Sequence, residues 1–175
     1  MEELESTEAK LMAAIADLTE EQSKFKINPM VWSIHECMEH IVITEVGVYR
    51  ILCKENSETA SRVAEHDEMV GKQTIAAAQQ DRNTKRISPD NVKPMGRFSN
   101  LDELKSKFQS NRKRISDGLR NNEFVFDNQL FKHPVLGELT KKDWLNFMIQ
   151  HTERHRHQIE DIKTDVSFSA HAKSL

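Results

Sequence analysis

Apolar residues recur every three or four positions in four stretches of the chain, which is the spacing of one face of an α-helix. These stretches cover approximately residues 3–24, 33–54, 99–121 and 140–163. The second begins with Ser33-Ile34-His35-Glu36, a capping-box pattern in which serine and glutamate bond the first free amides of a helix. The pattern therefore predicts four long helices.

The connection between the second and third helices, residues 55–99, is too long for a tight turn. Residues 55–82 are polar and expected to be partly helical, whereas 83–99 contain two prolines and a glycine and should be irregular. The sparse apolar anchors of this connection are Val63, Val70 and Ile75. A loop through residues 133–137 precedes the last helix.

We predict an all-α, four-helix bundle with a long crossover connection. Residues 1–166 would form this single domain, and residues 167–175 a flexible tail.

Composition narrows the functional classes. The 175 residues suit one domain, and a formal net charge of -3 argues against nucleic acid as a partner. No apolar run approaches the roughly 20 residues of a membrane span, and the acidic start has no signal-peptide pattern. Two cysteines without a disulfide framework suit a reducing compartment. The expected protein is soluble and cytoplasmic, without a membrane partner.

Two histidines stand in what should be the buried stripe of the last helix. At helical spacing this stripe consists of Trp144, Met148, His151, His155, Gln158 and Ile162. Its ends are apolar and its middle is imidazole, and a buried polar group without a partner costs roughly 1–3 kcal/mol. Two imidazoles one turn apart can hold one divalent cation from a single helix.

A third ligand is expected from the second helix, where His40 lies at one edge of the apolar face. Its neighbours on that helix are small or polar: Glu36, Cys37, Thr44 and Gly47. Three neutral imidazoles would leave coordination positions open, as in catalytic sites. The alternative is that these histidines are ordinary buried hydrogen-bonding groups of a helical interaction module. The remaining histidines are assigned to the surface or to loops: His35, His66, His133, His157 and His171.

Four further residues each have a functional and a structural interpretation. Glu36 could orient His40 or act as a general base, or it could serve only the capping box. Gln158 could hydrogen-bond a ligand ring or a bound water, or pack between helices. Arg154 could hold an anionic cofactor or substrate, or be exposed. Cys37 could be a thiolate ligand or nucleophile, although a buried cysteine usually behaves as a small apolar residue.

The residues of two distant blocks resemble the DinB-like (YfiT-type) superfamily. The first block is Trp32-Ser33-x-x-Glu36-x-x-x-His40-Ile41. The second block begins with His133-Pro134-x-x-Gly137-x-Leu139-Thr140. It continues with Trp144-Leu145 and ends with His151-x-x-Arg154-His155-x-x-Gln158-Ile159. The resemblance covers approximately residues 5–163. It implies a four-helix bundle in which three histidines, here His40, His151 and His155, bind a divalent metal.

The resemblance also implies candidate functions. Some members of this superfamily transfer low-molecular-weight thiols such as bacillithiol or mycothiol, and one branch contains a maleylpyruvate isomerase. We therefore expect a metal-dependent transferase that uses such a thiol on a small-molecule substrate, with a homodimer as a candidate assembly. Imidazole ligands leave zinc, nickel and iron open. The alternatives are a non-catalytic metal- or small-ligand-binding stress-response protein, and a metal-assisted hydrolase with Glu36 as base.

Overall fold

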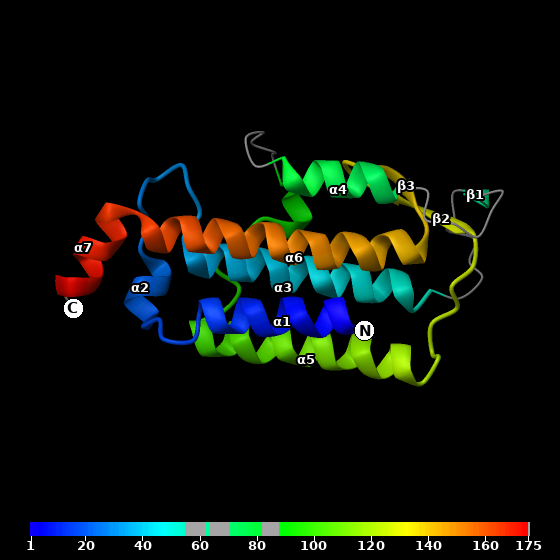
Figure 1. The fold of residues 1–175 in the computed structure, drawn as a ribbon, viewed down its shortest axis with the longest axis horizontal. Coiled ribbons are helices and arrows are strands. Elements are labelled where there is room, and N and C mark those ends of the chain that lie inside the picture. Colours follow the sequence, from blue (N-terminus) through cyan, green and yellow to red (C-terminus); the bar gives the residue numbers. More distant parts are fainter. Residues whose placement is uncertain (55–61, 64–70, 82–87, 175) are drawn as a thin grey trace.

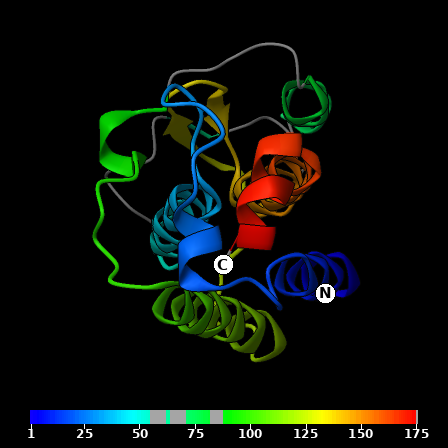
Figure 2. The same cartoon turned by 90° about the vertical axis from the view of Figure 1, so that its left-hand side faces the viewer.

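The computed structural model describes residues 1–54, 62–63, 71–81 and 88–174, and most of them are helical. The four long helices are α1 (Glu2–Ala14), α3 (Ile34–Leu52), α5 (Leu101–Arg120) and α6 (Lys141–Thr164). Helix α3 packs against α6 and α5, and α1 completes the bundle by packing against the same two helices (Figures 1 and 2). The prediction of an all-α bundle is confirmed. None of the described helices is long and apolar enough to cross a membrane.

The predicted helix starts are present. Helix α3 begins with the Ser33–Glu36 capping box, and α6 begins with a second box between Thr140 and Asp143. The side chain of Asn100 accepts the N–H of Glu103 at the start of α5. In each case a polar side chain satisfies an amide that has no partner within its own helix.

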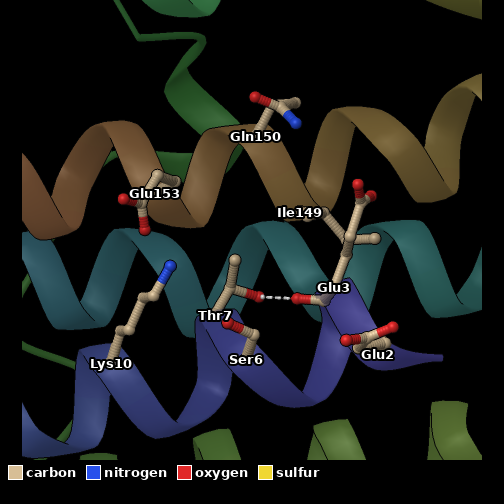
Figure 3. Close-up of a pocket in the computed structure, with 8 residues that line it drawn as sticks. All are labelled: Glu2, Glu3, Ser6, Thr7, Lys10, Ile149, Gln150 and Glu153. Carbon is tan, nitrogen blue, oxygen red and sulfur yellow. Dashed lines mark hydrogen bonds between the residues drawn. The ribbon is translucent and has the colours of Figure 1, made fainter.

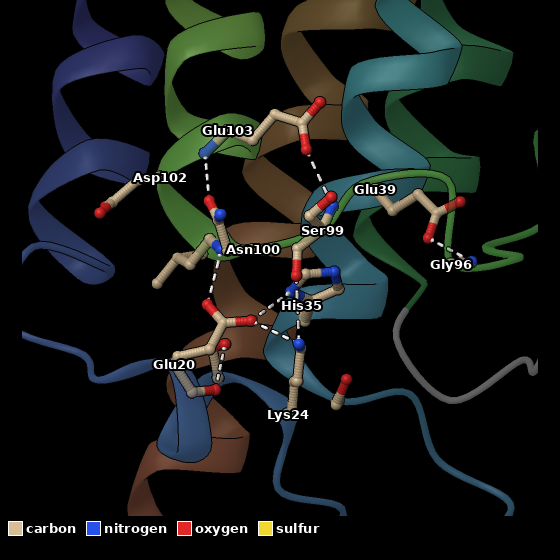
Figure 4. Close-up of polar contacts among 12 residues, drawn as sticks. Glu20, Lys24, His35, Glu39, Gly96, Ser99, Asn100, Asp102 and Glu103 are labelled. Carbon is tan, nitrogen blue, oxygen red and sulfur yellow. Dashed lines mark hydrogen bonds and ion pairs between the residues drawn. The ribbon is translucent and has the colours of Figure 1, made fainter.

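The first helix is shorter than predicted. Instead of one helix over 3–24, the chain forms α1 and a separate short helix, α2 (Glu20–Lys24). Thr19 caps α2 within a capping box of its own, which favours a new helix start at this point. Helix α2 turns towards the start of α5, where a Glu20 carboxylate oxygen accepts the N–H of Leu101 at 2.7 Å (Figure 4).

The crossover contains a helix, as expected, and a short turn. Helix α4 (Lys72–Gln80) packs on α6, and the 3-10 turn η1 (Asp90–Val92) lies against α3. Ile75, one of the three expected anchors, is fully buried. Val63 belongs to a short strand, β1 (Arg62–Val63), whereas Val70 lies outside the described residues.

The loop expected before α6 contains a small sheet. Strand β2 (Gln129–His133) pairs antiparallel with β3 (Gly137–Leu139) on one side and with β1 on the other. The hairpin aligns Phe131 with Leu139, and both side chains are buried. These strands are too short to show an alternating pattern that can be separated from a loop.

The end of the chain is helical. Val166–Ser174 form α7, where a flexible tail from residue 167 was expected. Phe168 is buried in the core and contacts the ring of Phe25 edge-on, and His171 stacks on the same Phe25 ring at 4.4 Å. Two aromatic contacts thus attach this segment to the chain around α2.

A layer of polar side chains crosses the middle of the bundle. Arg112 of α5 donates from Nε to the Glu45 carboxylate of α3 at 2.8 Å and from Nη2 to the Thr152 hydroxyl of α6 at 2.7 Å. Its Nη1 atom donates to the carbonyl of Leu4 and the hydroxyl of Thr7 in α1. Two separate apolar clusters lie on either side of this layer.

Candidate metal centre

Helices α3 and α6 bring the three predicted histidines together. The Nε2 atom of His151 lies 3.0 Å from Nε2 of His40 and 3.2 Å from Nε2 of His155. All three side chains are buried, and they form the one group of potential metal ligands found among the described residues. Periodicity alone placed two of these rings on one face, and packing of α3 against α6 supplies the third.

The outer nitrogen of two of the rings is already committed. Nδ1 of His40 lies 2.7 Å from the carbonyl oxygen of Val92 in η1, and Nδ1 of His155 lies 3.0 Å from Oε1 of Gln158. Because a carbonyl oxygen can only accept, each Nδ1 must carry the proton and donate it. In the neutral ring, the Nε2 atoms of His40 and His155 therefore present lone pairs to the centre.

The centre then has too few protons for its contacts. Nε2 of His151 is close to two acceptors and can donate at most one proton, so at least one of these close N···N contacts has no proton to bridge it and is repulsive. A cation between the three nitrogens would remove this repulsion. In a tetrahedral site with Zn–N bonds of about 2.0–2.1 Å, two nitrogen ligands are about 3.3 Å apart. The observed separations are close to that value.

Burial keeps the three imidazoles neutral by disfavouring their charged form. It lowers the pKa of His155 to about 3 and the pKa of His151 well below its usual range, and in both rings the neighbouring histidines add to the effect. Burial also lowers the pKa of His40, against the opposing hydrogen bond to Val92. Neutral imidazole is the form that binds metal, so the environment favours ligation at neutral pH.

Aromatic rings enclose the imidazoles. The half-buried Trp32 ring lies 4.9 Å from the ring of His40 and 6.1 Å from that of His155, and Phe147 lies 5.0 Å from His151. In the sequence, Trp32 stood out only as the first residue of the block that resembles the DinB-like superfamily. Its contact with two imidazoles makes it a wall of the centre, which limits access of water.

Glu36 occupies its capping position. One carboxylate oxygen accepts the N–H of Ser33 at 2.7 Å, and the ammonium of Lys26 lies within 3.0 Å of both oxygens. Both oxygens thus have partners at the start of α3. A role for Glu36 as general base stays a prediction, and it would require the carboxylate to leave these partners.

Gln158 and Arg154 contact protein groups. Gln158 accepts from His155, so it holds the ring of a candidate ligand, one of the roles expected for it. Arg154 donates from Nη1 to the carbonyls of Gln79 and Asp81 at the end of α4. Arg154 thus links the end of α4 to α6. Its binding of an anionic cofactor stays a prediction.

Cys37 points into the apolar core and not into the centre. Its side chain is fully buried among apolar residues, and burial, together with the nearby Glu36 charge, raises the pKa of the thiol above its ordinary value. A thiol that stays protonated is neither a metal ligand nor a nucleophile. Cys37 is also absent from the cluster of candidate ligands among the described residues, so it packs as a small apolar side chain, and its role as ligand or nucleophile stays a prediction without support from its position.

Two histidines assigned to the surface or to loops are buried. Nδ1 of His133 accepts the N–H groups of Val135 and Leu136, and burial lowers the pKa of His133 to about 4. His35 is buried beside Glu20, with 3.8 Å between its Nδ1 and a carboxylate oxygen (Figure 4).

His157 is partly exposed, as predicted, and faces Glu153 of its own helix. His66 lies outside the described residues.

Sequence reasoning missed two groups beside the centre. The carbonyl of Val92 has no signal in a sequence, because any residue offers one. Glu39 gave a weak signal, as an acidic residue next to His40 on a helix that is otherwise buried there. Its carboxylate is almost completely buried and accepts three backbone N–H groups, from Met95, Gly96 and Arg97. Burial alone would raise the pKa of Glu39, but these bonds lower it below its usual value.

A separate pocket of about 480 Å³ opens on the surface between α1 and α6 (Figure 3). It is lined by Glu2, Glu3, Ser6, Thr7, Lys10, Ile149, Gln150 and Glu153. Lys10 and Glu153 point towards each other across it. The imidazoles instead lie where α6 meets α3, so this pocket and the metal centre are different places.

Comparison with known proteins agrees with the geometry. The family model described as the DinB superfamily matches residues 3–159. The chain is also similar to an uncharacterized protein of Bacillus subtilis (strain 168), YuaE, with 24% identity over 149 residues, which cover 85% of this chain and 88% of that protein. No solved structure gives a significant match.

Proposed function

Because the chain belongs to the DinB superfamily, we propose that it is a divalent-metal-dependent enzyme that transfers a low-molecular-weight thiol to a small electrophilic molecule. His40, His151 and His155 would hold the metal through their Nε2 atoms. The metal part of the proposal rests on the shortage of protons at the centre. The buried Nε2 atoms of His40 and His155 lie 3.0 and 3.2 Å from Nε2 of His151, and at most one proton is available for these two contacts.

The chemistry follows from an open coordination sphere. A divalent ion on three neutral imidazoles keeps positions for further ligands and lowers the pKa of a thiol bound there. The sulfur of this thiolate would form a bond to an electrophilic carbon, while the leaving group departs with its electron pair and the thiol proton passes to solvent. Trp32 and Phe147 would limit water at the centre, and Gln158 would hold the ring of His155 in the binding orientation.

Metal content tests the first half of the proposal. Protein purified without an affinity tag should contain close to one zinc, nickel or iron ion per chain by elemental analysis. His151→Ala removes a direct ligand and should lower the affinity by more than the roughly 10–100-fold that loss of an outer hydrogen-bond partner costs. His157→Ala is the matched control, since His157 lies on the same helix but faces Glu153. Equal metal content in both variants would contradict the site.

Turnover tests the second half. The metal-loaded protein should accelerate the conjugation of monochlorobimane with bacillithiol, mycothiol or another small thiol, and the metal-free protein and His151→Ala should not. If metal binds but no thiol is consumed in any metal form, the transferase proposal is wrong while the metal site remains.

A non-catalytic metal-binding protein is the second candidate. The engagement of Glu36 by Ser33 and Lys26 favours it, because the candidate base that the sequence suggested already has partners. A metal-assisted hydrolase would need this carboxylate, so Glu36→Gln should abolish hydrolysis and retain metal. Metal retention without any turnover would support the binding protein.

A further inference from the structure

The segment whose carbonyl orients the ring of His40 is held in place by Glu39, the residue that precedes His40 in the sequence. Val92, whose carbonyl fixes the proton on Nδ1 of His40, lies in η1, a three-residue turn. So short a turn has little structure of its own to hold a carbonyl in one direction. The position of this carbonyl must therefore be set by contacts that the surrounding segment makes with the helical bundle.

Glu39 makes those contacts. Its two carboxylate oxygens accept the successive N–H groups of Met95, Gly96 and Arg97 at 2.9, 2.9 and 3.1 Å. Gly96 has φ +72°, and this left-handed conformation turns successive amides towards one point, forming a nest that binds an anion. Here the anion is a side chain of the same protein (Figure 4 shows the bond from Gly96).

Arg97 extends the connection towards Val92. Its Nη1 atom donates to Glu39 at 3.2 Å and to the carbonyl of Lys93 at 2.7 Å. Lys93 directly follows Val92, so one guanidinium links the Glu39 carboxylate to the peptide beside the His40 acceptor. The contact path runs from α3 through the nest and Arg97, and returns to α3 at His40.

We propose that Glu39 is a positioning residue for the metal centre: by binding the 95–97 nest it fixes the Val92 carbonyl, which keeps His40 in the tautomer that directs the Nε2 lone pair inwards. This inference rests on the proposed metal function for its purpose. The tautomer itself is a property of the metal-free protein and is measured separately. Without this anchor, His40 is free to carry its proton on Nε2 and cannot bind a metal there.

The test replaces Glu39→Gln, which puts an amide N–H₂ group where one acceptor oxygen stood and removes the charge facing Arg97. Asp143→Asn is the matched control, because Asp143 is also a buried carboxylate that accepts backbone N–H groups, from Gly71 and Thr140, but holds a different part of the crossover. Nitrogen-15 NMR of the metal-free proteins reports the His40 tautomer, and zinc titration reports affinity.

Wild type and Asp143→Asn should show His40 protonated on Nδ1. Glu39→Gln should show a mixture of tautomers and a roughly 10–100-fold weaker zinc affinity. Should Glu39→Gln fail to fold, Arg97→Ala replaces it, since Arg97 is partly exposed and its loss breaks the side-chain link between Glu39 and Lys93 while the backbone N–H groups of the nest remain. An unchanged His40 tautomer in these variants, or an equal change in Asp143→Asn, would overturn the inference. Failure of wild type to bind any metal would instead overturn the proposed function and leave the tautomer comparison valid.

Discussion

The nitrogen that carries the proton determines what each buried histidine can do. At His40 and His155 an oxygen acceptor holds the proton on Nδ1, so Nε2 is free to bind a cation. His133 has the opposite arrangement, because its Nδ1 accepts two backbone N–H groups and its proton must be on Nε2. The same side chain thus serves two purposes within one molecule, with His133 fixing the β2–β3 turn.

Burial of His133 should make the protein sensitive to acid. The unfolded chain binds a proton on this ring near its ordinary pKa of about 6.5, whereas the folded ring binds one only near pH 4. The free energy of unfolding should therefore fall as the pH falls from 6.5 towards 4, by about 2 kcal/mol for this residue between pH 7 and pH 5. His133→Asn keeps an acceptor for both N–H groups and cannot be protonated. Urea unfolding of both proteins at the two pH values should show a smaller loss in the variant; equal losses would contradict the assignment.

The three candidate metal ligands could be predicted because helical spacing can be read directly from the sequence. His151 and His155 share a face by their separation of four, and His40 lies among small and polar neighbours on the second helix. The groups that orient these rings were not predictable in the same way. Val92 and Glu39 act through contacts that depend on the path of an irregular segment, and local patterns do not determine that path.

At the level of elements, the sequence predicted best where several signals coincide. Helices α3, α5 and α6 combine an apolar stripe with a capping residue, and all three were found near their expected ends. The break between α1 and α2 was missed because the apolar spacing continues across it. Helix α7 was missed because a nine-residue segment at a chain end shows little periodicity, and tertiary contacts decide its structure.

The docking of α7 can be measured through one aromatic side chain. Phe168 is 5% exposed and packs in the core, so Phe168→Ala should lower the free energy of unfolding by about 3 kcal/mol, near the lower end for buried phenylalanine. Val166→Ala, at an 83% exposed position in the same helix, should change it by less than about 0.5 kcal/mol. Chemical denaturation compares the two. Two equally small effects would mean that this segment is a loose tail in solution.

At the scale of the whole molecule, the core is divided by its polar layer. Each of the four long helices contributes to this layer, and apolar residues of the same helices lie before and after it. Because a buried charge needs its partner, sliding one helix by a turn would separate Arg112 from Glu45 and leave both in an apolar environment. The layer therefore favours one alignment of the bundle, and with it the alignment of α3 and α6 that brings the three imidazoles together.

Removing one partner of the Arg112–Glu45 pair should lower the free energy of unfolding much more than removing both. Glu45→Ala leaves the fully buried Arg112 guanidinium without its counter-ion and should cost about 3–5 kcal/mol of the free energy of unfolding. Glu45→Leu combined with Arg112→Met removes both charges. Thr7 and Thr152 then still donate to carbonyls of their own helices, so no buried hydroxyl loses its only acceptor. The free energy of unfolding of the double variant should lie within about 1 kcal/mol of the wild-type value or exceed it.

Zinc binding by the same double variant tests whether the layer aligns the helices. If the layer is needed for a single alignment, the stable double variant should bind zinc more weakly than wild type, because α3 and α6 are no longer held in register. If zinc affinity is unchanged at full stability, the apolar surfaces alone fix the alignment. The denaturation midpoint reports the stability of the protein, and the zinc titration reports the alignment of α3 with α6. Together they show whether the same contacts of the layer contribute to both.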